Sequence, residues 1–151
     1  MRVLLADDSD LILVRLQSMV SSYEQVEIVA SCNNGTDTLK ALRTLEPDLA
    51  IVDIKMPGLS GLEVVKEIRK ENKTIKFIIL TFYPSQYYRK LAIQAGANYF
   101  FSKVDDFEKV SRLIADLVEK EEIRKRTKLV NGKFNLIMQF QNEKIFSSGT
   151  N

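Results

Sequence analysis

Three aspartates directly follow short apolar segments, a position from which carboxylates can hold a divalent cation. Asp7 and Asp8 come after residues 3–6, and Asp53 comes after residues 49–52. If the two segments are neighbouring parallel strands, their carboxyl ends meet at one edge of a sheet and the carboxylates converge. Converging carboxylates repel one another, which raises a pKa unless a cation neutralises them. The three oxygen ligands therefore predict a site for Mg²⁺ or Mn²⁺.

Thr81 and Lys103 follow two later apolar segments and complete a set suited to phosphoryl transfer. An ionised Asp53 beside a cation is an oxygen nucleophile. The Lys103 ammonium offsets charge on phosphoryl oxygens, and the Thr81 hydroxyl donates a hydrogen bond to them. This chemistry depends mainly on positioning and charge neutralisation. Each residue alone is more often a helix cap, a strand residue or a solvated charge, but together they predict a site with Asp53, Thr81 and Lys103 as its catalytic residues.

Short apolar segments alternate with amphipathic segments of helix length through most of the chain. This alternation predicts right-handed βαβ units and a parallel sheet covered by helices on both faces. We expect an α/β fold, a flavodoxin-like doubly wound sheet of five strands in the order 2-1-3-4-5 with five helices. In that order the first and third strands are neighbours, and the topological switch point lies between them. The expected strands cover residues 3–6, 26–30, 49–52, 77–80 and 99–101.

The contents of cysteine and histidine exclude several classes of site. The chain has one cysteine and no histidine, which excludes an internal disulfide, a zinc site of Cys and His, and a histidine-based catalytic triad. No apolar run approaches the ~18 residues that a membrane span needs. Asp7 and Asp8 also interrupt any signal peptide at the N-terminus. These features predict a cytoplasmic protein that has no membrane partner.

The pattern changes after about residue 125, where we expect a short C-terminal β-hairpin. The dipeptide Asn131-Gly132 is typical of a type I′ turn, and residues 133–140 after it contain alternating apolar side chains. Such a strand has one apolar face, which packs onto the domain or pairs with another chain. We favour self-association as a homodimer. The expected domains are residues 1–122 and a C-terminal extension of unknown role, residues 123–151.

The C-terminal extension is also mildly basic. Residues 119–151 contain seven Lys/Arg and four Glu, in a chain of net charge +2. The basic residues Arg124, Lys125, Arg126 and Lys128 could contact a phosphate backbone. They fit a solvated helix end better, because Glu121 and Lys125 stand at i,i+4 and positive charge is favourable near a helix C-terminus. No helix-turn-helix pattern follows, and we therefore expect no DNA binding.

The chemically informative residues, taken in order, resemble the receiver domain of bacterial two-component response regulators. The resemblance extends from residue 1 to about 120 and rests on VLLADDS (residues 3–9), DIKMPGLSGLE (residues 53–63), Thr81, AGA (residues 95–97), Phe100 and Lys103. It implies that Asp53 is the phosphoacceptor of a phosphorelay, supplied by a sensor histidine kinase or a phosphotransfer protein. It also implies that Asp8, Asp53 and the Lys55 backbone carbonyl bind the metal directly. Asp7 would act mainly through water.

The same resemblance implies a conformational switch. The Thr81 hydroxyl moves toward the phosphoryl group, and the Phe100 ring fills the vacated space. The output is binding of a downstream protein or dimerisation. The sequence departs from the family at three positions: Val104 replaces a common proline, Phe100 lacks a tyrosine hydroxyl, and Phe82 is bulkier than the usual small residue.

Two residues flank the expected path of the water that hydrolyses the phosphoryl group. Lys55 and Tyr83 each lie two positions beyond a site residue. We expect replacement of Tyr83 by a small residue to change the lifetime of the phosphorylated form.

Two other functions compete with a signalling switch that modifies only its own aspartate and is not an enzyme for separate substrates. The first is a magnesium-dependent phosphatase with an aspartyl nucleophile, similar to haloacid-dehalogenase-like proteins. Asp8 and Asp10 fit the spacing of its two aspartates loosely, whereas Asp53 is followed at +2 by Lys55. The second is a degenerate receiver that acts as a docking scaffold, which requires an inert acidic site.

Overall fold

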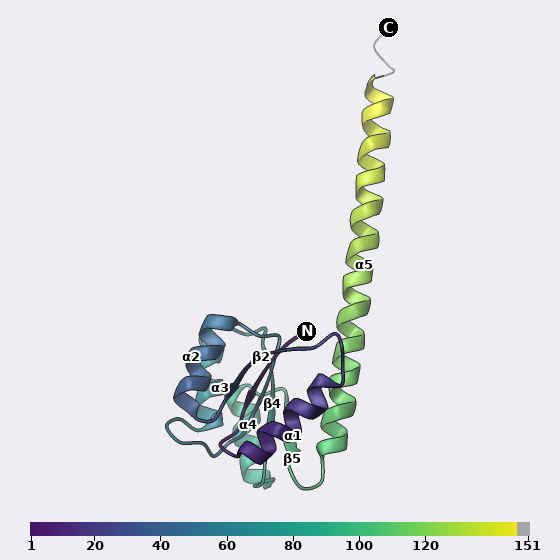
Figure 1. Ribbon diagram of the computed structural model, residues 1–151. Helices are drawn as coiled ribbons and strands as arrows, with labels where there is room; N and C mark the ends of the chain where they lie inside the picture. Colours follow the sequence, from purple (N-terminus) through teal and green to yellow (C-terminus); the bar gives the residue numbers. More distant parts are fainter. Residues whose placement is uncertain (148–151) are drawn as a thin grey trace. The chain divides into compact units, whose positions relative to one another are not determined.

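The computed structural model describes residues 1–147 (Figure 1). Within them, strands and helices alternate along the whole chain. The strands are β1 (Arg2–Ala6), β2 (Glu27–Cys32), β3 (Leu49–Val52), β4 (Lys76–Thr81) and β5 (Tyr99–Ser102). The helices are α1 (Asp10–Ser21), α2 (Gly35–Leu45), α3 (Gly61–Arg69), α4 (Gln86–Ala95) and α5 (Phe107–Ser147). The chain divides into two compact units between Ala115 and Asp116, and each is described by itself.

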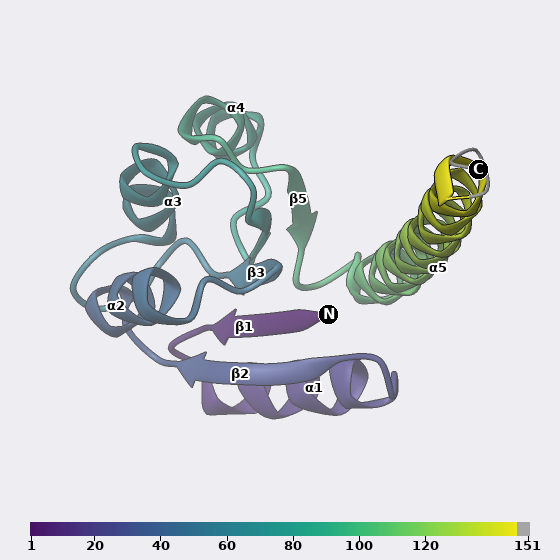
Figure 2. The same ribbon diagram turned by 90° about the horizontal axis from the view of Figure 1, so that it is seen from above.

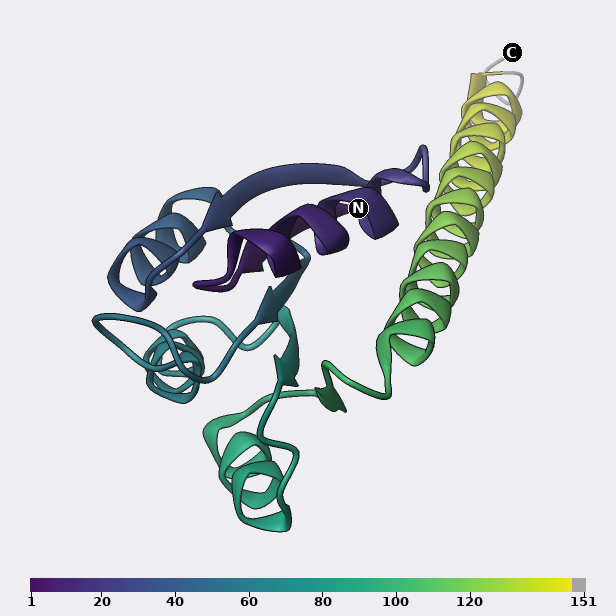
Figure 3. The same cartoon turned by 60° about the horizontal axis from the view of Figure 1, so that its bottom comes forward.

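The first unit contains a parallel sheet in the order β2-β1-β3-β4-β5, which confirms the predicted fold class and strand order. Its central strands are continuously apolar because helices cover both faces, and all four residues of β3 are buried. Figures 2 and 3 show α2, α3 and α4 following one another along one face, with α1 on the other. The Tyr23 hydroxyl lies 3.1 Å from the Ser111 carbonyl oxygen and donates to it, which ties the segment after α1 to the first turns of α5.

Side-chain caps fix where the helices begin on the same sheet edge. Ser9, Asn34, Ser60 and Ser85 each accept a hydrogen bond from a backbone N–H in the first turn of α1, α2, α3 and α4. These caps satisfy N–H groups that otherwise have no partner inside the helix. In α3 the Glu63 side chain also accepts from the Ser60 N–H, which completes a capping box. The loops between strand ends and caps are therefore short and well defined.

The predicted C-terminal β-hairpin is wrong, because residues 127–140 belong to α5. Asn-Gly is only a local turn signal, and a glycine inside a helix costs about 1 kcal/mol relative to alanine. The surrounding residues are rich in Lys, Arg, Gln, Leu and Met, which favour helix. Ile137 also breaks the alternation that a strand requires, whereas Val130, Phe134 and Ile137 follow at helical spacing. Helical propensity therefore outweighs the turn signal.

The second unit begins at Asp116 inside α5. Residues 148–151 of the expected extension lie outside the described residues, and the boundary at residue 122 stays a prediction. In the part of the chain that the structure describes, we find no helix with both the length and the apolar character needed to cross a membrane.

Candidate functional site

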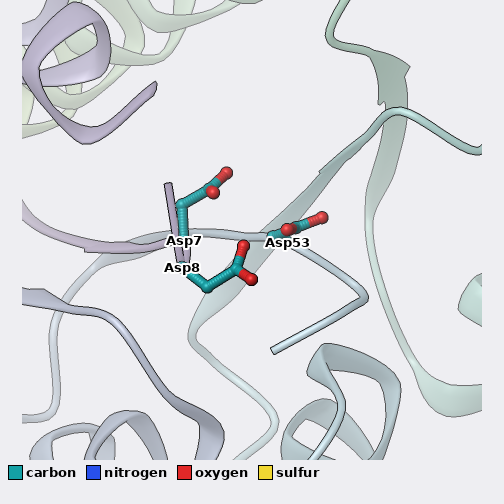
Figure 4. Close-up of side chains that lie close together, drawn as sticks. All are labelled: Asp7, Asp8 and Asp53. Atoms are coloured by element: carbon teal, nitrogen blue, oxygen red, sulfur yellow. The ribbon is translucent and has the colours of Figure 1, made fainter. Parts of the chain in front are cut away.

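Three carboxylates meet where β1 and β3 end, as the sequence predicts. Asp7 and Asp8 follow β1, Asp53 follows β3, and a carboxylate oxygen from each lies within 4.8 Å of the others (Figure 4). The Asp53 N–H donates to the Ala6 carbonyl oxygen at 2.9 Å, which continues the β1–β3 pairing into the site. Asp7 and Asp53 are 1% and 6% exposed, whereas Asp8 is exposed. The cluster thus has a buried floor and one carboxylate that reaches solvent.

Lys103 provides the positive charge in this cluster. Its buried ammonium lies 2.5 Å from Asp7 Oδ2 and 3.1 Å from Asp53 Oδ2. It stands directly after β5, where the Lys103 N–H donates to the Thr81 carbonyl oxygen at 2.9 Å. One ammonium against three carboxylates leaves an excess of negative charge when all are ionised. The residues therefore fit a hard divalent cation such as Mg²⁺, which binds carboxylate oxygens and retains waters.

Burial and the neighbouring charges of Lys103 and Asp7 set the pKa of the Asp53 carboxyl. Burial raises the pKa of the Asp53 carboxyl from 3.8 to about 6, because desolvation disfavours the charged form. Lys103 acts in the opposite direction and lowers this pKa, while the Asp7 charge raises it. Near neutral pH the carboxylate is ionised but only partly compensated. An ionised carboxylate in this position can act as an oxygen nucleophile, and a further cation would offset more of its charge.

The loop after Asp53 is held by close backbone contacts. The Gly61 N–H donates to the Ile54 carbonyl oxygen at 2.8 Å, and a Cβ at Gly61 would lie 1.9 Å from the Asp53 carbonyl oxygen. Only a glycine allows this approach. Gly58 has φ +79°, a conformation that side chains other than glycine rarely adopt. The segment that carries Asp53 and Lys55 is therefore anchored against the start of α3.

Thr81 ends β4 and is fully buried. Its Oγ1 accepts a hydrogen bond from the Tyr83 N–H at 3.0 Å, and its own hydroxyl hydrogen can still donate. The aromatic rings of the next two residues, Phe82 and Tyr83, each lie beside a lysine ammonium group. The Lys103 ammonium lies 4.8 Å from the Phe82 ring centroid, and the Lys55 ammonium lies 3.9 Å from the Tyr83 ring centroid. The Lys55 side chain thus lies over Tyr83, and Lys55 also lines a hollow of about 540 Å³ together with Asp8.

Phe100 is buried in β5, and its ring has a partner that sequence reasoning missed. The Arg89 guanidinium lies 4.8 Å from the ring centroid, and both residues line a hollow of about 250 Å³ beside α4 and β5. No motif marks Arg89, which lies on another element. The sequence gives only a weak signal for Arg89, which lies one helical turn after Ser85, the residue that caps α4. Among the residues that the structure describes, no peptide bond is cis, so Lys103 and Val104 are joined in the trans form.

Residues 3–115 match the family model described as the response regulator receiver domain. The chain belongs to this family. GacA, a response regulator of Pseudomonas aeruginosa, is 31% identical over 113 residues, covering 75% of this chain and 53% of GacA. YvfU, an uncharacterized transcriptional regulatory protein of Bacillus subtilis, is 33% identical over 118 residues, which cover 78% of this chain and 59% of YvfU. The chain therefore spans about half the length of the curated relatives it matches.

The solved structures agree with this assignment. A DNA-binding response regulator of the LuxR family from Staphylococcus aureus has a TM-score of 0.71 at 29% identity, with 78% of this chain and 97% of that chain covered. Receiver domains are the signalling switches of two-component systems, bind Mg²⁺ through an acidic pocket, and interact with histidine kinases or phosphotransfer proteins. This chain has a cluster of three aspartates, Asp7, Asp8 and Asp53.

Proposed function

We propose that this receiver domain accepts a phosphoryl group on Asp53 from a histidine kinase or a phosphotransfer protein. The observation that carries the proposal is the Asp53 carboxylate, 3.1 Å from the Lys103 ammonium and within 4.8 Å of the oxygens of Asp7 and Asp8. A nucleophile, a fixed cation and further oxygen ligands lie at one edge of the sheet. These are the requirements of phosphoryl transfer, which relies on positioning and charge neutralisation.

The transfer forms one bond and breaks another. A carboxylate oxygen of Asp53 bonds to phosphorus while the bond from phosphorus to the donor nitrogen breaks, and the donor imidazole retains the electron pair. Lys103 holds the Asp53 carboxylate in place and offsets charge on the phosphoryl oxygens. Thr81 donates its hydroxyl hydrogen to one of those oxygens. Asp8, Asp53 and the Lys55 carbonyl would hold Mg²⁺, with Asp7 acting through water, and the ion would neutralise developing negative charge.

The phosphorylated state is read out through Thr81 and Phe100. Movement of the Thr81 hydroxyl toward the phosphoryl group vacates space next to β5, and the Phe100 ring shifts to fill it. Arg89 then loses or changes its contact with that ring. The surface beside α4 and β5 changes, and a downstream protein binds it. The cytoplasm is the proposed compartment, because the partners of the domain act there.

Turnover of separate phosphate esters is not part of the proposal. The phosphatase alternative requires a second aspartate two positions after the nucleophile. Asp10, the partner of Asp8 in that arrangement, opens α1 with its side chain exposed. The acidic cluster is built instead from Asp7, Asp8 and Asp53. The docking-scaffold alternative requires an inert site, whereas the carboxylates and the Lys103 ammonium that phosphoryl transfer needs are all present here.

Incubation with Mg²⁺ and acetyl phosphate, followed by intact mass measurement, tests the proposal. We expect one added phosphoryl group in the wild-type protein and none in Asp53→Asn. Chelation of Mg²⁺ should abolish the adduct. An adduct of equal yield in Asp53→Asn would place the acceptor elsewhere. A parallel assay with a generic phosphate ester should show no turnover, and steady release of phosphate would favour the phosphatase.

A further inference from the structure

We propose that residues 123–141 of α5 pair with the same segment of a second copy of this chain as a parallel two-stranded coiled coil. The helix continues far beyond the domain that the family model covers, to Ser147. Its apolar side chains within this segment are more than half exposed at most positions, including Val130 at 63% and Phe134 at 61%. A helix of this kind gains most of its stability from packing of an apolar face. Packing against a partner would bury this exposed apolar face of α5 and stabilise the helix.

The exposed side chains form a seam with the spacing of a coiled coil. Positions spaced alternately by four and three residues lie along one line of a helix and make the a and d sites of heptads. Val130 and Ile137 occupy successive d sites, and Phe134 occupies the a site between them. The full seam is Ile123, Thr127, Val130, Phe134, Ile137 and Gln141. The polar a sites, Thr127 and Gln141, can fix the register of the pair at some cost in stability.

Charges beside the seam select a parallel pair of identical helices. In a parallel coiled coil, each g residue faces the e residue five positions later on the other helix. Glu119 then faces Arg124 of the second copy, an attractive pair, and Arg126 faces the neutral Asn131. Residues 119–138 bring no like charges together in this register. An antiparallel pair centred on the seam would place Lys133 against Lys133 of the second copy, because g residues face g residues there, and like charges at that position are unfavourable.

The same two cations argue against a lipid surface as the occupant. Leu129, Leu136 and Phe140 form a second apolar strip, and Arg126 and Lys133 lie on the helix between this strip and the seam. A helix lying on a bilayer would have to bury both cations beneath its apolar face. A second helix packs against the seam alone and leaves both cations at its solvent-exposed flank, the usual place of charged g residues.

The seam is tested with two pairs of substitutions displaced by one residue. Val130→Glu with Ile137→Glu introduces two charges at d sites. The matched control, Leu129→Glu with Leu136→Glu, has the same spacing and charge outside the seam. Sedimentation equilibrium of the full chain over a broad range of concentrations should show a wild-type dimer. The seam variant should be monomeric, and the control should remain dimeric. Circular dichroism verifies that both variants retain the folded domain.

Salt distinguishes self-association from binding to an anionic surface. Residues 123–145 carry six Lys/Arg and one Glu, so added salt should strengthen the dimer by screening repulsion between the two helices. Three results would overturn the proposal: a wild-type monomer at every concentration, equal disruption by both variant pairs, or a monomer that binds vesicles of anionic lipid in a salt-sensitive manner. Phosphorylation of Asp53 is measured separately, and its failure leaves these outcomes unaffected.

Discussion

At the scale of single residues, Asp53 combines burial with the need to be ionised. The folded protein retains the Asp53 proton up to a pH of about 6, whereas the unfolded chain releases it near 3.8. The resulting stabilisation is fully present below pH 3.8 and is lost as the pH rises through about 6. Above that pH the ionised carboxylate lowers the free energy of unfolding. The negative charge of Asp53 therefore does not stabilise the fold at neutral pH.

Asp53→Asn should therefore stabilise the metal-free protein above pH 6. We expect a gain of about 1–2 kcal/mol in the free energy of unfolding at pH 8, after allowance for solvent screening. The difference should shrink as the pH falls toward 4. Denaturant unfolding in the presence of a chelator measures both values. Glu24→Gln, at an exposed position, is the control, and an equal gain there would contradict the explanation.

Lys103 is the second residue whose charge is tied to the cluster. Lys103→Met removes the ammonium from two buried carboxylates and leaves their repulsion uncompensated. We expect a loss of about 3 kcal/mol in the free energy of unfolding without metal. Saturating Mg²⁺ should recover part of the loss, because the ion neutralises the same carboxylates. Thermal unfolding with and without Mg²⁺ tests this, and the exposed Lys76→Met should respond to neither change.

We expect Tyr83 to limit the access of water to a phosphoryl group on Asp53. Its half-exposed ring lies beneath the Lys55 ammonium, and Lys55 lines the same hollow as Asp8. Tyr83→Ala should shorten the lifetime of the phosphorylated form a few-fold, a change of about 1 kcal/mol in the barrier to hydrolysis. Decay of the mass adduct after removal of the donor gives the rate. An unchanged decay rate in Tyr83→Ala would contradict this prediction. Tyr87→Ala, at an exposed position on α4, is the control and should leave the decay rate unchanged.

At the scale of elements, the turn from Asp53 into α3 depends on one glycine. Gly61→Ala forces a Cβ against the Asp53 carbonyl oxygen, and we expect a loss of about 1–3 kcal/mol in stability together with weaker Mg²⁺ binding. Gly132→Ala is the matched control, because nothing lies within 4 Å of its added Cβ. Inside a helix it should gain up to about 1 kcal/mol. Calorimetry and Mg²⁺ titration of both variants measure the contrast, and equal effects would contradict it.

Elements of the domain could be predicted from the sequence because their signals are both local and repeated. Buried parallel strands are continuously apolar, and Asp7, Asp8 and Asp53 follow directly after two of them. The C-terminal segment could not be predicted as easily, because one Asn-Gly dipeptide suggested a turn while helix propensity was spread over many residues. Arg89 was missed for a different reason. Its contact with Phe100 arises only when α4 packs beside β5.

At the scale of the whole molecule, chemistry and association are carried by different units. The acidic cluster, Lys103, Thr81 and Phe100 all belong to Met1–Ala115, and the proposed coiled-coil seam belongs to the unit that begins at Asp116. Because each unit is compact by itself, a truncation can separate the two properties. A shortened chain that ends at Glu122 retains the predicted domain and lacks the seam from Ile123 onward.

The chain shortened to residues 1–122 should fold, take the phosphoryl group from acetyl phosphate with Mg²⁺, and remain monomeric. The phosphorylation rate should match that of the full chain, because every residue proposed to hold the phosphoryl group or the metal is retained. Time courses of intact mass give the rate, and light scattering gives the mass in solution. If the shortened chain is phosphorylated much more slowly, the second unit contributes to the site. If it dimerises like the full chain, the association surface lies in the domain and not in α5.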